Sequence, residues 1–247
     1  MTIETILPIP DIFSARRILC IQPHYDDNDI GAAGTLALLV QAGAEIDYLT
    51  VTDDLMGLVD HSLSPEAGAD ALKHDQFMAG EIIGVRKQCW LGYPDAGEYS
   101  YHSLRKDILR SIRQFSPDFI FTCDPWLTYE AHRDHIQVGL AVAEATILAN
   151  ITKITSGDPA LDAAYRGGIQ GIAFYMTREP NLTIDITSTW EKKVAAVHSY
   201  MAQFDNASMA EMIHALDAKS LQLAVGHSYW RGEALKVLHP SALHCGI

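Results

Sequence analysis

Short apolar runs alternate along this chain with longer segments in which apolar residues recur at helical spacing. The run Arg17–Gln22 stops at Pro23, and apolar residues then recur every third or fourth position over residues 29–41, before Gly43. Such spacing lines one face of a helix, and a glycine commonly ends it. Glu45–Thr52 is a second strand-like run. These segments predict a β-α-β unit, which favours parallel strands joined by a right-handed crossover.

The same alternation continues to the end of the chain. It predicts further strands at 88–93, 118–123, 171–177 and 182–186, and helices at 67–83, 104–115, 132–150, 188–204 and 208–225. Strands and helices in repeated alternation are typical of an α/β fold with a layered, mostly parallel sheet. Residues 150–168 match neither pattern. They are interpreted either as a loop near the substrate or as a plain surface connection.

Composition narrows the range of partners. The chain has 247 residues, of which 48% are hydrophobic and 20% charged, so it can bury a substantial core and we expect one domain over residues 1–247. The formal net charge of −13 argues against nucleic acid, because phosphate binding needs clustered Lys and Arg. The same charge disfavours an anionic membrane surface. A small molecule is the expected partner, and a homo-oligomer is compatible with the composition.

Apolar stretches, the N-terminal segment and the spacing of the cysteines are used to predict the cellular location of the protein. No apolar stretch reaches the ~18 residues of a membrane span, and residues 1–11 lack the basic and apolar parts of a signal peptide. The cysteines show no CxxC spacing and are scattered at Cys20, Cys89, Cys123 and Cys245. A disulfide framework is therefore not expected, and we predict a cytoplasmic protein.

Two polar segments that combine histidine with aspartate follow strand-like runs: His24-Tyr25-Asp26-Asp27 comes just after the first run, and His132-Arg133-Asp134-His135 ends the stretch 124–135 that follows the run 118–123. Ligands bind outside the carboxyl ends of parallel strands, so both segments emerge at one edge of the predicted sheet. Zinc in hydrolytic sites takes three His or carboxylate ligands and lowers the pKa of a bound water to ~7. A further carboxylate and a histidine can then accept and donate protons.

Either segment alone has an ordinary explanation as a polar surface loop. The chain contains eleven histidines, and short His/Asp or His/His spacings arise by chance. The occurrence of two such segments, each after a predicted strand, favours a metal site.

The motifs resemble those of one family. Pro23-His24-Tyr25-Asp26-Asp27 and Gly31-Ala32-Ala33-Gly34-Thr35 resemble the HPDDE…GGT signature of the LmbE / PIG-L family of zinc-dependent N-acetylglucosaminyl deacetylases. Three later segments resemble further family motifs and occur in the same order along the chain. Leu91-Gly92-Tyr93-Pro94-Asp95 resembles LGxPD, and His132-Arg133-Asp134-His135 resembles HxDH. Asp185-Ile186, with Lys193 and His198-Ser199, resembles DI…K…HxS. The resemblance implies a Rossmann-like three-layer fold and removal of an N-acetyl group from a GlcNAc-type sugar or glycoconjugate.

The resemblance also implies roles for individual residues. It implies three ligands for zinc or another divalent metal: His24, Asp27 and His135. Asp26 takes the position of the family's general base, next to the zinc-bound water. His132 takes that of an acid or oxyanion partner, and Asp134 is expected to orient its imidazole, as the aspartate of a catalytic triad does.

Two positions depart from the family pattern, because Tyr25 replaces a proline and Asn28 replaces a glutamate. Asn28 is a good helix N-cap. The loss of the family's carboxylate at this position is expected to change contacts with the substrate. Among the other polar residues, Asp95 is predicted to bind a sugar hydroxyl, although its Pro-Asp sequence also suits a simple turn. Tyr129 is predicted to help polarise the substrate carbonyl or to pack in its loop. Asp53 and Asp54 either face the active edge or form a solvated turn.

Three other functions are compatible with the same motifs. The first is an amidase that acts on a sugar-thiol conjugate. The second is a sugar-binding relative without activity, against which the retained Asp26 argues, since such a protein needs no base. The third is a phosphatase, which the scarcity of basic residues disfavours: Arg133 is the one Lys or Arg within the two segments, and phosphate recognition relies on such residues.

Overall fold

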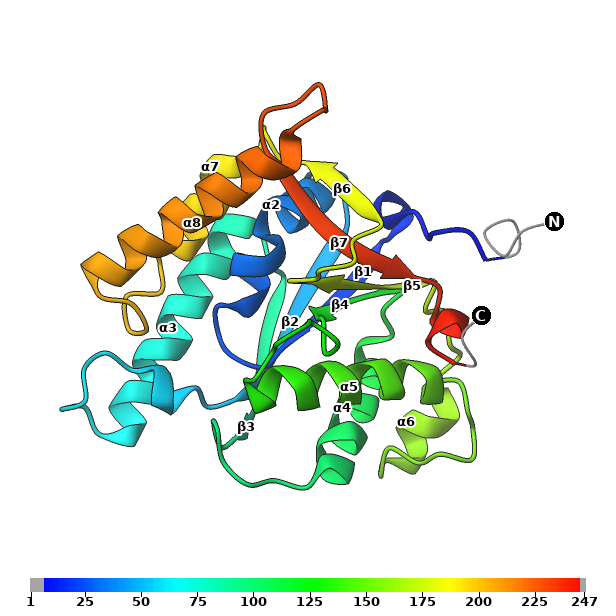
Figure 1. The fold of residues 1–247 in the computed structure, drawn as a ribbon. Coiled ribbons are helices and arrows are strands. Elements are labelled where there is room, and N and C mark those ends of the chain that lie inside the picture. The colour runs from blue at the N-terminus through cyan, green and yellow to red at the C-terminus, as the bar shows by residue number, and fades with distance from the viewer. Residues whose placement is uncertain (1–6, 245–247) are drawn as a thin grey trace.

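A seven-stranded sheet runs through the centre of the computed structural model, which describes residues 7–244 (Figure 1). Residues 1–6 and Cys245, which contributed to the sequence predictions, lie outside that range. The sheet has the order β3-β2-β1-β4-β5-β7-β6. Its strands are β1 (Arg17–Gln22), β2 (Glu45–Thr52), β3 (Lys87–Tyr93), β4 (Phe119–Cys123), β5 (Gly171–Tyr175), β6 (Leu182–Asp185) and β7 (Gly232–Leu238). β1 to β5 are parallel, and β7 lies antiparallel between β5 and β6.

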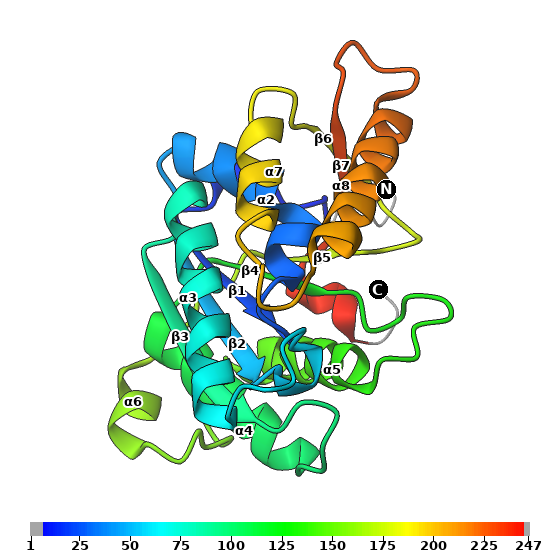
Figure 2. The ribbon, with the colours of Figure 1, turned by 90° about the vertical axis from the view of Figure 1, so that its left-hand side faces the viewer.

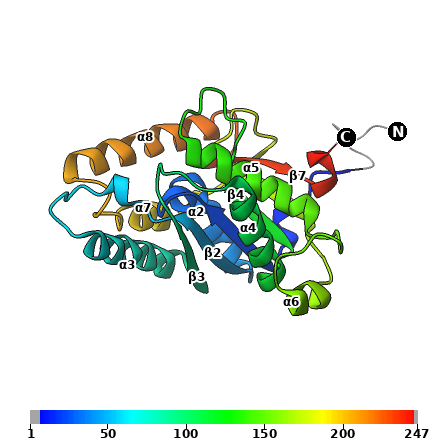
Figure 3. The same cartoon turned by 90° about the horizontal axis from the view of Figure 1, so that it is seen from below.

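Helices cover both faces of the sheet, so the molecule has three layers (Figures 1 and 2). One face carries α2 (Asp27–Gln41), α3 (Pro65–Ile83), α7 (Trp190–Val197) and α8 (Asn206–Ala224). The other carries α4 (Tyr101–Phe115), α5 (Arg133–Leu148) and α6 (Pro159–Ala164), which Figure 3 shows in front of the sheet. Short 3-10 turns are η1 (Ile12–Ser14), η2 (Leu55–Gly57) and η3 (Pro240–Leu243). The predicted three-layer α/β fold is confirmed.

Two apolar cores lie on opposite sides of the sheet. Because successive side chains of a strand point to opposite faces, Phe119 and Phe121 of β4 join the core under α2, α3 and α7, and Ile120 joins the core under α4 and α5. All the residues of β4 are buried. This two-sided burial explains why the central strands read as continuous apolar runs.

Helix α2 begins two residues earlier than the sequence predicted. Asp26 occupies the N-cap position, and Asp27 lies in the first turn, where a carboxylate interacts favourably with the positive end of the helix dipole. Asn28 is therefore not the N-cap, and it is fully buried. Gly31 is required for packing rather than for backbone freedom, since a Cβ there would lie 2.3 Å from the ring of Tyr175.

The structure differs from the prediction in one further helix end and in two elements that were not predicted. The helix predicted at 188–204 ends at Val197, and turns follow it. Strand β7 was missed, because its pattern GEALKVL buries a charged residue, Glu233, that forms an ion pair with Lys193. Residues 150–168 contain the short helix α6, which sequence periodicity did not reveal.

Residues 150–168 form a surface connection, which answers the question that the sequence left open. They join the end of α5 to the start of β5, at the edge of the sheet opposite the loops that follow β1 and β4. Helix α5 has 16 residues, so at about 1.5 Å per residue its end lies about 22 Å from its beginning. The connection is held by Arg113, whose buried guanidinium donates to the carbonyls of Ala149, Ile151 and Ile154. It does not border the site described below.

Two further expectations concern the same described residues. No helix within residues 7–244 has the length and apolar character needed to cross a membrane. Cys20, Cys89 and Cys123 are free thiols.

Candidate functional site

The two polar segments meet where the sheet changes its winding direction. β1 and β4 are adjacent and parallel, but β1 is followed in the chain by β2 on one side and β4 by β5 on the other. Loops that leave such strands diverge, and the crevice between them is where α/β proteins bind ligands. The sequence placed both segments at one sheet edge but could not show that β1 and β4 are neighbours.

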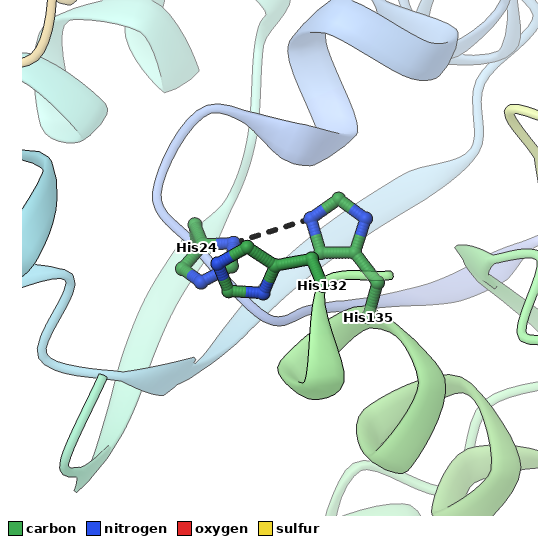
Figure 4. A group of neighbouring side chains, drawn as sticks. All are labelled: His24, His132 and His135. Carbon is green, nitrogen blue, oxygen red and sulfur yellow. Dashed lines mark hydrogen bonds between the residues drawn. The ribbon is translucent and has the colours of Figure 1, made fainter. Parts of the chain in front are cut away.

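Three of the predicted residues converge in a tight triangle. His24 Nδ1 lies 3.3 Å from His135 Nε2 and 3.3 Å from Asp27 Oδ2, and His135 Nε2 lies 3.2 Å from Asp27 Oδ1. Tetrahedral zinc holds nitrogen and oxygen ligands at about 2.0–2.1 Å, which sets the ligand atoms about 3.3 Å apart. Figure 4 shows the two imidazoles facing each other, with His132 beside them. The triangle therefore has the size of one face of a metal coordination shell.

Carboxylates hold the outer nitrogens of both imidazoles. His24 Nε2 lies 3.3 Å from Asp95 Oδ1 and 3.7 Å from Asp134 Oδ2, and His135 Nδ1 lies 3.2 Å from Glu130 Oε2. A metal-binding histidine typically donates its second N–H to such a partner, which fixes the tautomer and aims the other nitrogen at the metal. In both rings the nitrogen left free by this arrangement is the one in the triangle.

Electrostatics in the triangle also suit a cation. Burial opposes protonation of His24, but the surrounding carboxylates of Asp134, Asp27 and Asp95 outweigh it and hold the pKa of His24 far above its usual range. For Asp27, burial is likewise outweighed, here by His135 and His24, so its pKa is well below normal. Both pKa shifts show that the carboxylates around the two imidazoles favour a positive charge at this position. A divalent metal fits the site on both geometry and charge.

Other groupings of the same side chains could also hold a metal. His24, His132 and His135 form one set, and His24, Asp95, His132 and Asp134 another, with one nitrogen or oxygen of each residue within 4.8 Å of the rest. The site is therefore rich in ligands. Neither of these two sets includes Asp27, whose Oδ2 lies 3.3 Å from His24 Nδ1 and whose Oδ1 lies 3.2 Å from His135 Nε2.

Asp26 lies beside the triangle without joining it. Its side chain is buried and lines a cavity of about 310 Å³ together with His24, Asp27, Asp54, Met56, Gly57, Asp95, His132, His135 and Gln203. Burial, reinforced by the negative charge of Asp27, raises the pKa of Asp26 to about 7. A carboxylate with a pKa in this range is matched to proton transfer near neutral pH.

His132 and Asp134 do not form the pair that the resemblance implied. Asp134 accepts hydrogen bonds from Tyr99 Oη at 2.6 Å and from the backbone N–H of Ala96 at 2.8 Å, and its nearest imidazole nitrogen is that of His24. His132 is exposed and packs edge-on against the His24 ring, with 4.6 Å between ring centroids. The expected orienting contact is absent because the hydrogen bonds from Tyr99 and Ala96 hold the Asp134 carboxylate against His24.

The two predicted substrate-binding residues lie in different environments. Asp95 lines the cavity, but its carboxylate faces His24 and accepts the backbone N–H of Met56 at 3.1 Å. Tyr129 is 95% exposed, with a left-handed φ of 71°, and does not line the cavity. Asn28, where the motif departs in charge, is buried in the core, so it has no access to a substrate.

Sequence reasoning missed three residues that the structure brings to the site. Glu130, two residues before the second polar segment, was given no role. Asp54 was left open as either a residue of the active edge or part of a solvated turn, and Gln203 was not considered. Asp54 is 3% exposed, so it is not a solvated turn residue. Its position directly after β2 was the available signal. The sequence held no signal for Gln203, because this residue reaches the cavity from the turns after α7.

The chain is similar in sequence to a known protein family and to curated deacetylases. Residues 19–146 match the family model described as PIG-L, GlcNAc-PI de-N-acetylase. The diacetylchitobiose deacetylase of Thermococcus kodakarensis is 35% identical over 191 residues, which cover 76% of this chain and 70% of that protein. A probable N-acetyl-alpha-D-glucosaminyl L-malate deacetylase 2 of Bacillus anthracis is 25% identical, over 76% of this chain and 82% of its own length.

The fold has a similar counterpart among solved structures. The N,N'-diacetylchitobiose deacetylase from Pyrococcus horikoshii, complexed with its inhibitor, superposes with a TM-score of 0.85 at 31% identity. The match covers 94% of this chain and 86% of that structure. The structural similarity therefore extends over nearly the whole chain.

Proposed function

This chain belongs to the PIG-L family of GlcNAc-PI de-N-acetylases, and we propose that it is a metal-dependent hydrolase that removes an N-acetyl group from a GlcNAc-type sugar or glycoconjugate. The observation that carries the proposal is the triangle of His24 Nδ1, Asp27 and His135 Nε2, with sides of 3.2 to 3.3 Å. The buried carboxylate of Asp26 lies beside it, at the rim of an open cavity. That combination suits hydrolysis of an amide.

His24, Asp27 and His135 are proposed to hold the metal, and zinc is the ion that this mixture of imidazole and carboxylate fits best. When bound, such an ion polarises the acetamide carbonyl and lowers the pKa of water enough to supply a hydroxide nucleophile at neutral pH. Asp95 and Glu130 are proposed to favour the ligating tautomer of the two imidazoles, since their carboxylates lie 3.3 and 3.2 Å from the outer nitrogens.

Asp26 is the proposed general base. Its position next to Asp27 places its carboxylate in the same cavity as the ligands, where it accepts a proton from the attacking water. The water oxygen forms a bond to the acetyl carbon, and the bond between that carbon and the amide nitrogen then breaks. The products are acetate and a free amine on the sugar.

His132 is the proposed acid that protonates the departing amine. It lines the cavity, and its ring is exposed, so it can reach a leaving group that enters from solvent. Partial desolvation at the cavity wall and the neighbouring His24 and His135 lower the pKa of His132, which makes its protonated form a stronger acid. Because Asp134 bonds elsewhere, its proposed part in catalysis is indirect and passes through His24.

The substrate of this site is proposed to be a small N-acetylated sugar or glycoconjugate that the enzyme meets in the cytoplasm. The names of the relatives support this class, since two of them are deacetylases of N-acetylglucosamine derivatives. Asp95, which lines the cavity, remains a proposed substrate contact. Tyr129 is 95% exposed and does not line the cavity, so it is proposed to contribute little to substrate binding.

Metal analysis combined with an acetate-release screen tests the proposal. We expect about one zinc per chain and acetate release from diacetylchitobiose or a related GlcNAc conjugate, lost on chelation and restored by zinc. Cleavage of sugar-thiol amides without acetate release would identify the amidase instead. Sugar binding without any turnover after zinc loading would contradict an enzymatic role and favour a non-catalytic relative.

A further inference from the structure

Asp54 is an unusual residue at the end of β2. Its side chain is 3% exposed, and its backbone has a left-handed conformation with φ 53° and ψ 23°. Non-glycine residues adopt this region uncommonly, and Asp and Asn do so more readily than other residues. The carboxylate is thus directed inward by the backbone rather than out to solvent.

The Asp54 carboxylate fastens the turn that carries the proposed base. Its Oδ2 accepts the backbone N–H of Tyr25 at 3.1 Å, and Tyr25 directly precedes Asp26. Thr52 holds the same turn, because both its N–H and its hydroxyl donate to the carbonyl of Pro23, at 3.0 and 2.8 Å. Thr52 and Asp54, at the end of β2, therefore hold the backbone of the turn that contains Asp26.

Gln203 fixes Asp54 from the opposite side. Its Nε2 donates to the same Oδ2 of Asp54 at 2.7 Å, and both side chains line the cavity that contains Asp26. Gln203 comes from the turns after α7, which are anchored because the hydroxyl of buried Tyr200 donates to Asp29 Oδ2 and the N–H of Ala202 donates to Asp75 at 2.7 Å. The turns after α7, which are distant in sequence, thus hold the Asp54 side chain in place.

We infer that Asp54, held by Gln203, is a positioning residue that aims Asp26 at the attacking water through the backbone N–H of Tyr25. The inference rests on the proposed role of Asp26 as base. It assigns the effect to hydrogen bonding and not to the charge of Asp54. Misplacement of a reacting group by about 1 Å can cost about 10²-fold in rate, so such a brace has a measurable effect.

The chain offers a substitution that separates the two effects. Both donors end on Oδ2 of Asp54, whereas Oδ1 faces Gly57. In Asp54→Asn the amide oxygen can replace Oδ2, so both hydrogen bonds are kept while the charge is removed, and Asn tolerates the left-handed backbone. Asp54→Ala removes both bonds.

We expect Asp54→Ala to lower kcat by about 10²-fold, with KM within about threefold of wild type and an unchanged zinc content. Asp54→Asn should retain kcat within about threefold, because the hydrogen bonds are what matters. Gln203→Ala leaves the Asp54 backbone untouched, but it also removes the direct contact of Gln203 with the Asp26 carboxylate. It should lower kcat by about tenfold with KM and metal unchanged, so Asp54→Ala and Asp54→Asn are the variants that isolate the brace. The reaction measured is acetate release by the zinc-loaded full chain.

Asp118→Ala is the matched control. Asp118 also anchors backbone N–H groups, those of Arg16 and Arg17, but at the opposite edge of the sheet, so its loss should lower Tm and leave kcat unchanged. The inference is overturned if Asp54→Ala keeps kcat within threefold, if Asp54→Asn is as impaired as Asp54→Ala, or if Asp54→Ala loses its zinc. Absence of acetate release from wild type would instead refute the proposed function itself.

Discussion

The two loops that build the site differ in how firmly they are held. In the inner loop, after β1, the side chains are buried, with His24 and Asp26 at 7% and Asp27 at 4% exposure, and hydrogen bonds from Thr52 and to Asp54 brace its backbone. The outer loop, residues 124–132 after β4, projects from the body, and Tyr129 within it is 95% exposed. The outer loop is held near its two ends, where Asp124 accepts the N–H of Trp126 and Glu130 that of His132.

This difference matches the work that each loop is proposed to do. A base and metal ligands must be held close to their productive geometry, and buried, braced positions supply that. A proton donor to a leaving group must meet substrates that arrive from solvent, which an exposed loop residue can do. The comparison predicts that substitutions in the inner loop have larger effects than those in the outer loop.

The largest effect is expected from the adjacent aspartates of the inner loop. Asp26→Asn should keep its zinc and lose about 10³-fold in kcat, because it removes the proton acceptor. Asp27→Ala should lose both zinc and activity, because it removes a ligand. Metal content by elemental analysis and acetate release by a coupled assay distinguish the two. An active Asp26→Asn enzyme would refute the assignment of the base.

Next in size is the loss of the proposed acid at the start of α5. His132→Ala should lower kcat by about 10²-fold with the metal content unchanged, because the nitrogen atoms of the triangle belong to His24 and His135. Single-turnover acetate release measures this step, and His102→Ala on the exposed surface of α4 serves as control. Loss of zinc in the variant would show that His132 is a ligand, as its proximity to His24 and His135 also allows.

A smaller effect is expected from the outer partner of His135. Glu130→Gln weakens the contact with His135 Nδ1, and changes to such partners typically cost about 10–100-fold in metal affinity. We expect a value near the lower end, about tenfold, because Glu130 is half-buried. Competition with a zinc chelator measures it. An unchanged affinity would mean that the rest of the shell orients His135 without Glu130.

The smallest effect is expected at the tip of the outer loop. Tyr129→Ala should change kcat and KM by less than about twofold, because a fully exposed side chain makes few contacts to lose. Steady-state kinetics on a GlcNAc conjugate are sufficient. A marked rise in KM would show that Tyr129 contacts the substrate, as the sequence suggested, and that the loop folds over the cavity when substrate binds.

Local sequence patterns predicted the fold and the metal triangle but failed at long-range contacts. The strands from β1 to β6 and the flanking helices other than α6 follow from apolar periodicity, whereas the residues of the triangle were implied by the resemblance of two short motifs to a known family. Strand β7 was missed because its buried Glu233 is paired with Lys193, a residue far away in the sequence. The expected pairing of Asp134 with His132 was wrong for a similar reason, since Tyr99 and Ala96 from another loop take the carboxylate.

By itself the sequence determined the layered fold, the family and which histidines and aspartates lie at the site, because each depends on residue types at short spacing. Only the tertiary structure decided that β1 and β4 are neighbours, that Asp95 and Glu130 stand behind the imidazoles, and that Asp54 and Gln203 brace the inner loop. Those contacts join segments that are distant along the chain, and their partners are chosen by packing geometry and burial. No local pattern of residues records that choice.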